Sequence, residues 1–100
     1  MTTTYPTKTM SDLFLAISTL QSPTELTHFF RDLMTIQELE AISTRWQIAQ
    51  MLQDKIPYLT IAKKCHVSTT TVTRVALWLH HGQGGYQLAL SRLHSPIKNV

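Results

Sequence analysis

Several features that identify whole classes of protein are missing from this sequence. Cys65 is the single cysteine among 100 residues, so no disulfide can form within the chain and a reducing compartment is indicated. No apolar run approaches the roughly 20 residues that span a bilayer. The N-terminus also lacks the basic region, apolar core and cleavage site of a secretory signal. We therefore expect a cytoplasmic protein with no membrane partner.

Acidic residues are absent from the second half of the chain. Residues 55–100 carry six basic residues and no acidic one, whereas residues 1–54 carry three basic and six acidic residues. The chain as a whole has a net charge of +3. A basic segment free of acids suits contact with the phosphates of a nucleic acid. The alternative is a solvated surface that is basic without binding anything.

Apolar residues recur at helical spacing, and no segment shows the sustained alternation of a strand. We therefore predict an all-α fold of about six helices. A helical domain is expected over residues 11–95, between a flexible tail at residues 1–10 and a second tail at residues 96–100. The expected helices cover residues 11–20, a segment that follows Ser22, a segment from Thr35 to about Gln53, and residues 58–64, 68–80 and 86–93.

Two of these helices begin with a recognisable capping signal. Ser22 is followed by proline at the first helical position and by Glu25, and Thr35 is followed by Glu38. Both patterns are capping boxes, in which the hydroxyl and the carboxylate bind free backbone N–H groups. The longer helix after Thr35 is apolar on more than one side, which is typical of a central, buried helix.

The segment from Tyr58 to Leu79 has the pattern of a helix-turn-helix. That motif needs two short helices, a tight turn, a small residue where the helices cross, and apolar residues on the shared inner faces. Ala62 is the small residue, and the inward positions hold Ile61, Cys65, Val67, Val72 and Val75. The turn position that is usually glycine is His66, where positive φ is often needed. An ordinary helical hairpin is the alternative interpretation.

The outer face of the second of these helices is rich in hydroxyl groups. Threonine can contact base edges or the thymine methyl, and arginine can bind guanine or phosphate. Lysines at the end of the preceding helix can bind phosphate oxygens and set the register on the duplex. The predicted DNA-binding residues are Lys63, Lys64, Ser68, Thr69, Thr70, Thr71, Thr73 and Arg74.

Other chemistry has little support in the sequence. Cys65 and His66, like His80 and His81, are adjacent pairs, and neighbours on a helix point apart instead of sharing a metal. No nucleophile, base and orienting acid occur at a recognisable spacing. We expect no metal site, no catalytic residue and no enzymatic activity.

Separated blocks of the sequence together resemble the tryptophan-repressor superfamily. The blocks are Leu33-Met34-Thr35, Glu38, Ser43-Thr44-Arg45 and Val72-Thr73-Arg74, with about one residue missing between the last two. The turn Gly84-Gly85-Tyr86 is similar to the YerC/YecD-type branch. The resemblance covers about residues 11–95. It implies a six-helix, intertwined homodimer that presents two recognition helices to a palindromic operator in double-stranded DNA.

The resemblance also implies an effector pocket. Met34 and Thr35 correspond to the entry pair, Arg45 to the arginine that stacks on the ligand, and Arg74 to the arginine that binds its carboxylate. Val75 and Trp78 stand where the family has glycine and serine, and both add volume. We therefore predict no cofactor and no requirement for L-tryptophan. Arg45 and Arg74 then either hold a smaller anion or form a structural and phosphate-binding pair.

The function predicted from the sequence is sequence-specific DNA binding by a repressor-like transcription regulator. A homodimer is expected, because the apolar residues before Gln53 exceed what one small domain can hide. The rival interpretation is a protein-interaction or structural helical dimer that has lost DNA binding.

Overall fold

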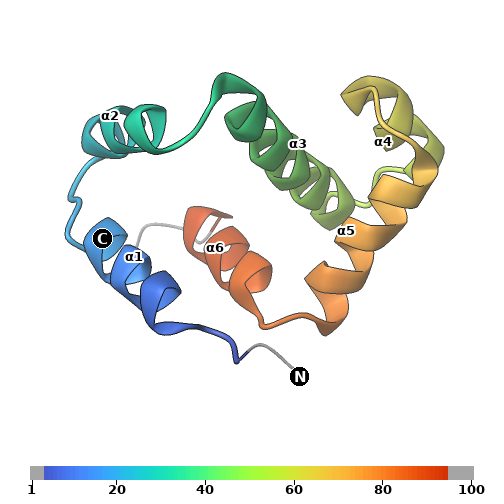
Figure 1. Ribbon diagram of the computed structural model, residues 1–100. Coiled ribbons are helices and arrows are strands. Elements are labelled where there is room, and N and C mark those ends of the chain that lie inside the picture. The colour runs from blue at the N-terminus through green and yellow to red at the C-terminus, as the bar shows by residue number, and fades with distance from the viewer. Residues whose placement is uncertain (1–3, 95–100) are drawn as a thin grey trace. The chain divides into compact units, whose positions relative to one another are not determined.

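The protein is all-α, as the sequence predicts. The computed structural model describes residues 4–94, which form six helices and no strand (Figure 1). The helices are α1 (Lys8–Ser18), α2 (Pro23–Leu33), α3 (Ile36–Gln53), α4 (Tyr58–Cys65), α5 (Thr69–His81) and α6 (Gly85–His94). Among these helices, none combines the length and hydropathy that a bilayer-spanning segment requires. The chain divides into two compact units, residues 1–39 and 40–100.

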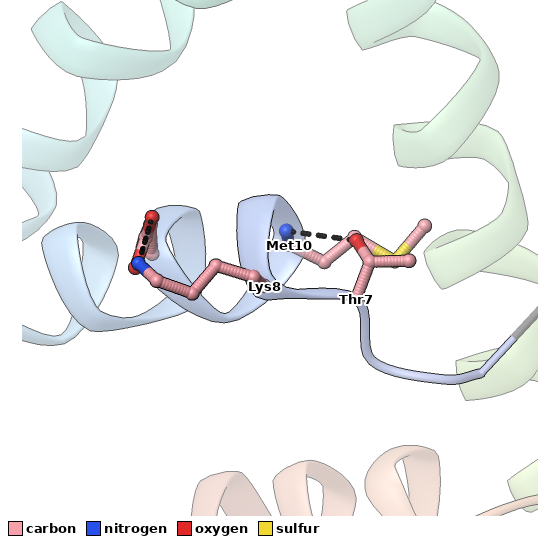
Figure 2. A network of polar contacts seen from close by, with 4 residues as sticks. Thr7, Lys8 and Met10 are labelled. Carbon is pink, nitrogen blue, oxygen red and sulfur yellow. Dashed lines mark hydrogen bonds and ion pairs between the residues drawn. The ribbon is translucent and has the colours of Figure 1, made fainter.

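Helix α1 of the first unit begins three residues earlier than the predicted Ser11. The Thr7 hydroxyl accepts a hydrogen bond of 3.2 Å from the Met10 N–H, and the Lys8 ammonium lies 2.9 Å from the Asp12 carboxylate (Figure 2). These polar contacts stabilise a first turn in which Met10 already has helical spacing to Leu13 and Phe14, so the expected boundary of the N-terminal tail at residue 10 is wrong. The expected tail at residues 96–100 lies outside the described residues.

The predicted capping box at Thr35 is complete, whereas the predicted box at Ser22 is present only in the hydroxyl half. The Ser22 hydroxyl accepts from the Glu25 N–H at 3.1 Å, and the Thr35 hydroxyl accepts from the Glu38 N–H at 3.1 Å. In return, the Glu38 carboxylate accepts a hydrogen bond of 2.9 Å from the Thr35 N–H. The Glu25 carboxylate instead accepts from the N–H of Gln21, one residue before the cap, at 2.8 Å. The capping residues Ser22 and Thr35 therefore determine where α2 and α3 begin.

The first unit buries little of its apolar surface. Neither α1 nor α2 contains a buried residue. Phe14 and Leu33 remain 45% and 46% exposed, and Leu15 is 69% exposed. A stable helix normally hides its apolar face against another element. These helices therefore leave apolar surface free to contact something outside the unit.

The second unit has a hydrophobic core built from α3, α4 and α5. Its buried members are Ile48, Ala49, Ile61, Ala62, Val72 and Val75. Ile48 and Ala49 are the only buried residues of α3, so the expectation of a central, buried helix holds for only part of it. Ile42, six residues before Ile48, is 38% exposed. Only the C-terminal part of α3 is therefore a core helix within one chain.

Candidate nucleic-acid interface

The connection between α4 and α5 is a tight turn centred on His66. The Val67 N–H donates to the Ala62 carbonyl at 3.0 Å, and the His66 N–H donates to the Lys63 carbonyl at 3.4 Å. His66 itself has φ 56° and ψ 46°, the left-handed conformation expected at this position. This pair of bonds is the Schellman motif, which ends a helix and reverses the chain.

Helix α5 starts immediately after this turn with a side-chain cap. The Ser68 hydroxyl accepts a hydrogen bond of 3.2 Å from the Thr71 N–H, as predicted for an N-cap serine. The inner face of α5 is buried and consists of Val72, Val75, Ala76 and Leu79. Their spacing of three and four residues makes one continuous stripe against the core, so the opposite face of α5 is presented outward.

The predicted DNA-binding residues lie mainly on that outer surface. The exposed members are Lys63, Lys64, Ser68, Thr69, Thr70, Thr73 and Arg74. Thr71 differs, because it is half-buried and its hydroxyl lies 3.2 Å from the Ser68 hydroxyl. The contact between the two hydroxyls holds the Thr71 side chain toward the cap and away from the outer face. The prediction of an exposed Thr71 is therefore wrong.

Positive charge surrounds the start of α5. Lys63 and Lys64 occupy the last turn of α4, immediately before the turn that leads into α5. Neither lysine forms an ion pair within residues 4–94, and the same is true of Arg74. The first N–H groups of α5 add the partial positive charge of a helix N-terminus. The surface can therefore attract phosphate groups. It also presents hydroxyl groups and one guanidinium group that can form hydrogen bonds with a ligand.

The residues of the predicted effector pocket are distributed over both units. Met34 and Thr35 belong to the first unit, between α2 and α3. In the second unit Arg45 and Arg74 are exposed, whereas Val75 is 1% exposed and packs in the core. The Val75 side chain is therefore already enclosed by protein atoms.

A different hollow exists within the second unit. It has a volume of about 790 Å³ and is lined by Trp46, Trp78, His81, Gly82, Gln83, Gly85, Tyr86 and Ala89. Trp78 is the one predicted pocket residue that lines it; Arg45, Arg74 and Val75 do not. The hollow is mostly apolar and aromatic, without a group of three or more metal-binding side chains among the described residues.

Sequence reasoning missed the aromatic wall of this hollow. Trp46 of α3 and Tyr86 of α6 stack with their ring centroids 6.2 Å apart. In the sequence, Trp46 is recognisable only as an apolar residue of the long helix after Thr35, and Tyr86 only as part of a turn and a short helix. Helical periodicity within each segment carries no information about which residues meet across 40 positions of sequence.

The fold is that of a Trp-repressor-like protein. The family model described as Trp repressor protein matches residues 8–94, and the chain belongs to that family. It is similar to the uncharacterized protein YerC of Bacillus subtilis (strain 168), at 35% identity over 86 residues, which are 86% of this chain and 83% of YerC. The resemblance to the YerC-type branch is thereby confirmed.

Two solved structures are also similar. A TrpR-like protein from Eubacterium eligens ATCC 27750 superimposes with a TM-score of 0.83 at 38% identity, covering 90% of this chain and 93% of that one. A proposed Trp repressor from Staphylococcus aureus gives a TM-score of 0.80 at 36% identity, covering 87% of each chain. Both likenesses include nearly the whole helical part of the chain.

Proposed function

We propose that this protein is a homodimeric transcription regulator that binds a palindromic operator by inserting α5 into the major groove of DNA. The observation that carries the proposal is the outer face of α5, where Thr70, Thr73 and Arg74 are exposed opposite a buried stripe. A helix with short polar side chains and an arginine fits the width and hydrogen-bonding pattern of the major groove.

The charge distribution supports the same proposal. Lys63 and Lys64 lie beside the start of α5 without an ion pair in the described chain. In a helix-turn-helix the first helix crosses the DNA backbone while the second enters the groove. The two lysines are at the end of α4 that leads into the turn, where they can contact phosphates as α5 contacts bases.

The dimer is supported by the apolar surface that one chain leaves exposed. Helices α1 and α2 have no buried residue, and Phe14, Leu15 and Leu33 are exposed. A second copy of the chain would cover such surfaces and would place two α5 helices on one duplex. Dimers of this kind bind two half-sites about one helical turn apart. Because the two copies are related by two-fold symmetry, the operator is expected to be palindromic.

Selection from random duplex DNA tests the proposal. The wild-type protein should enrich a palindromic sequence, and light scattering at micromolar concentration should give twice the chain mass of 11.4 kDa. Lys63→Ala should weaken binding to all duplexes nearly equally and make binding less dependent on salt. Arg92→Ala removes one positive charge from α6 instead, and it serves as the matched control.

The rival function, a protein-interaction dimer without DNA binding, makes a different prediction. It gives a dimer by light scattering but no enriched sequence and no difference between Lys63→Ala and Arg92→Ala. A stable monomer that binds no DNA would contradict both interpretations.

A further inference from the structure

The hydroxyl of Thr73 is already occupied within α5. Its oxygen donates a hydrogen bond of 2.9 Å to the backbone carbonyl of Thr69, one turn earlier in the helix. Thr73 is nevertheless exposed, on the outer face that also carries Thr70. Within the described residues, the hydroxyls of Thr69 and Thr70 make no hydrogen bond. The threonines of this face are therefore chemically different from one another.

The bond to Thr69 determines which group Thr73 presents to a ligand. A threonine in a helix has two favourable staggered positions for its γ atoms, because the third clashes with the preceding turn. With the hydroxyl held against the Thr69 carbonyl, the γ-methyl group takes the other favourable position. Thr73 therefore turns its polar atom toward the backbone of its own helix and leaves its methyl group available outside.

Leu77 adds a second apolar group next to the Thr73 methyl group on the outer face of α5. Leu77 follows Thr73 by four residues, which places the two side chains next to each other along the helix. Leu77 is 53% exposed. The outer face of α5 thus has a polar part at Thr70 and Arg74 and an apolar part at Thr73 and Leu77.

We infer that Thr73 is a specificity-determining residue that recognises thymine through its methyl group, by contact with the 5-methyl group of the base. The inference rests on the proposed function and adds the chemistry of one contact. The thymine 5-methyl group is the apolar feature of the major groove, and it distinguishes thymine from the other bases. A hydroxyl that already donates to the helix carbonyl is a poorer hydrogen-bond donor to a base than the free hydroxyl of Thr70.

Two substitutions separate the methyl group from the hydroxyl. Thr73→Val keeps the γ-methyl group and replaces the hydroxyl by a second methyl group, whereas Thr73→Ser keeps the hydroxyl and removes the methyl group. On the sequence selected by the wild-type protein, Thr73→Val should bind with nearly the wild-type dissociation constant. Thr73→Ser should bind about fifteenfold more weakly, because the homodimer loses one buried methyl contact in each half-site and each is worth about fourfold. Thermal unfolding of both variants checks that the fold is retained.

The DNA provides the complementary test. Each thymine of the selected duplex is replaced in turn by uracil, which lacks only the 5-methyl group. At one position in each half-site the replacement should weaken binding of the wild-type protein and of Thr73→Val about fourfold. The same replacement should have no further effect on Thr73→Ser, because the contact is already lost.

The results that overturn the inference are distinct from those that overturn the proposed function. Weak binding by Thr73→Val together with normal binding by Thr73→Ser would assign the contact to the hydroxyl. If uracil at every thymine position left binding unchanged, or if the selected site contained no thymine, the methyl contact would be excluded. The proposed DNA binding would still stand. If the wild-type protein selects no sequence, both the proposed function and the inference fail.

Discussion

Trp46 of α3 stacks on Tyr86 of α6, with ring centroids 6.2 Å apart and ring planes inclined by 20°. The two residues stand 40 positions apart in the sequence, and both line the hollow of the second unit. Gln87, the residue after Tyr86, donates a hydrogen bond of 2.7 Å to the Leu79 carbonyl of α5. Neighbouring residues at the start of α6 therefore connect it to both α3 and α5.

The stacked pair gives the first prediction. Tyr86→Ala removes the stacked ring and should lower the free energy of unfolding by about 2 kcal/mol, less than for a fully buried aromatic residue because Tyr86 is half-buried. Tyr86→Phe keeps the ring and should change it by less than about 0.5 kcal/mol. Urea denaturation of the two variants provides the comparison. Equal stabilities would mean that the stacking contributes nothing.

The turn at His66 gives the second prediction. A residue with a β-carbon in the left-handed region is strained by about 1–2 kcal/mol relative to glycine. His66→Gly should therefore raise the free energy of unfolding by about 1 kcal/mol, and Lys55→Gly should do the same after α3, where Lys55 has φ 62°. His66→Val should destabilise the protein, because β-branched residues tolerate this conformation worst. A less stable His66→Gly variant would contradict the strain argument.

Gly82 and Gly85 form a matched pair for the third prediction. A β-carbon at Gly82 would overlap the backbone carbonyl of Trp78, whereas a β-carbon at Gly85 would meet nothing within 4 Å. Gly82→Ala should therefore force the end of α5 to move and cost about 2 kcal/mol of stability. Gly85→Ala should leave the stability unchanged or raise it slightly, since alanine favours helix formation. Thermal melts that rank the two variants in the opposite order would exclude this geometry.

Local signals in the sequence predicted most of the fold. The starts of α2, α3 and α5 are set by Ser22, Thr35 and Ser68, whose hydroxyls bind backbone groups a few residues away. Such short-range contacts can be recognised from residue types and spacing alone. The inner faces of α4 and α5 followed from helical periodicity for the same reason.

Contacts across long stretches of sequence, and hydrogen bonds that depend on a rotamer, could not be predicted in this way. The stacking of Trp46 on Tyr86 depends on how α3 and α6 pack. Thr71 and Thr73 are both threonines of one helix, yet one joins the Ser68 cap and the other bonds to Thr69. Residue type gave both the same predicted role, and only the three-dimensional contacts distinguish them.

The last prediction is that DNA binding does not require L-tryptophan. Val75 replaces the glycine that the family resemblance places on the pocket floor, and its side chain is 1% exposed within the core. Trp78 replaces a serine, so a small hydroxyl that could bind the ligand's amine is lost and a large ring is added. Overfilling a packed site costs about 1–3 kcal/mol, which weakens a small-molecule affinity roughly ten- to a hundredfold.

Titration calorimetry with L-tryptophan measures the affinity, and selection of DNA with and without the amino acid measures its effect on function. No binding heat at millimolar L-tryptophan and identical selected sequences are expected. Trp78→Ser restores the family's serine but keeps Val75 where the family has glycine, so it should not by itself restore binding. A micromolar dissociation constant for the wild-type protein, together with tryptophan-dependent DNA binding, would contradict the prediction. This protein would then sense tryptophan, as the family resemblance implies.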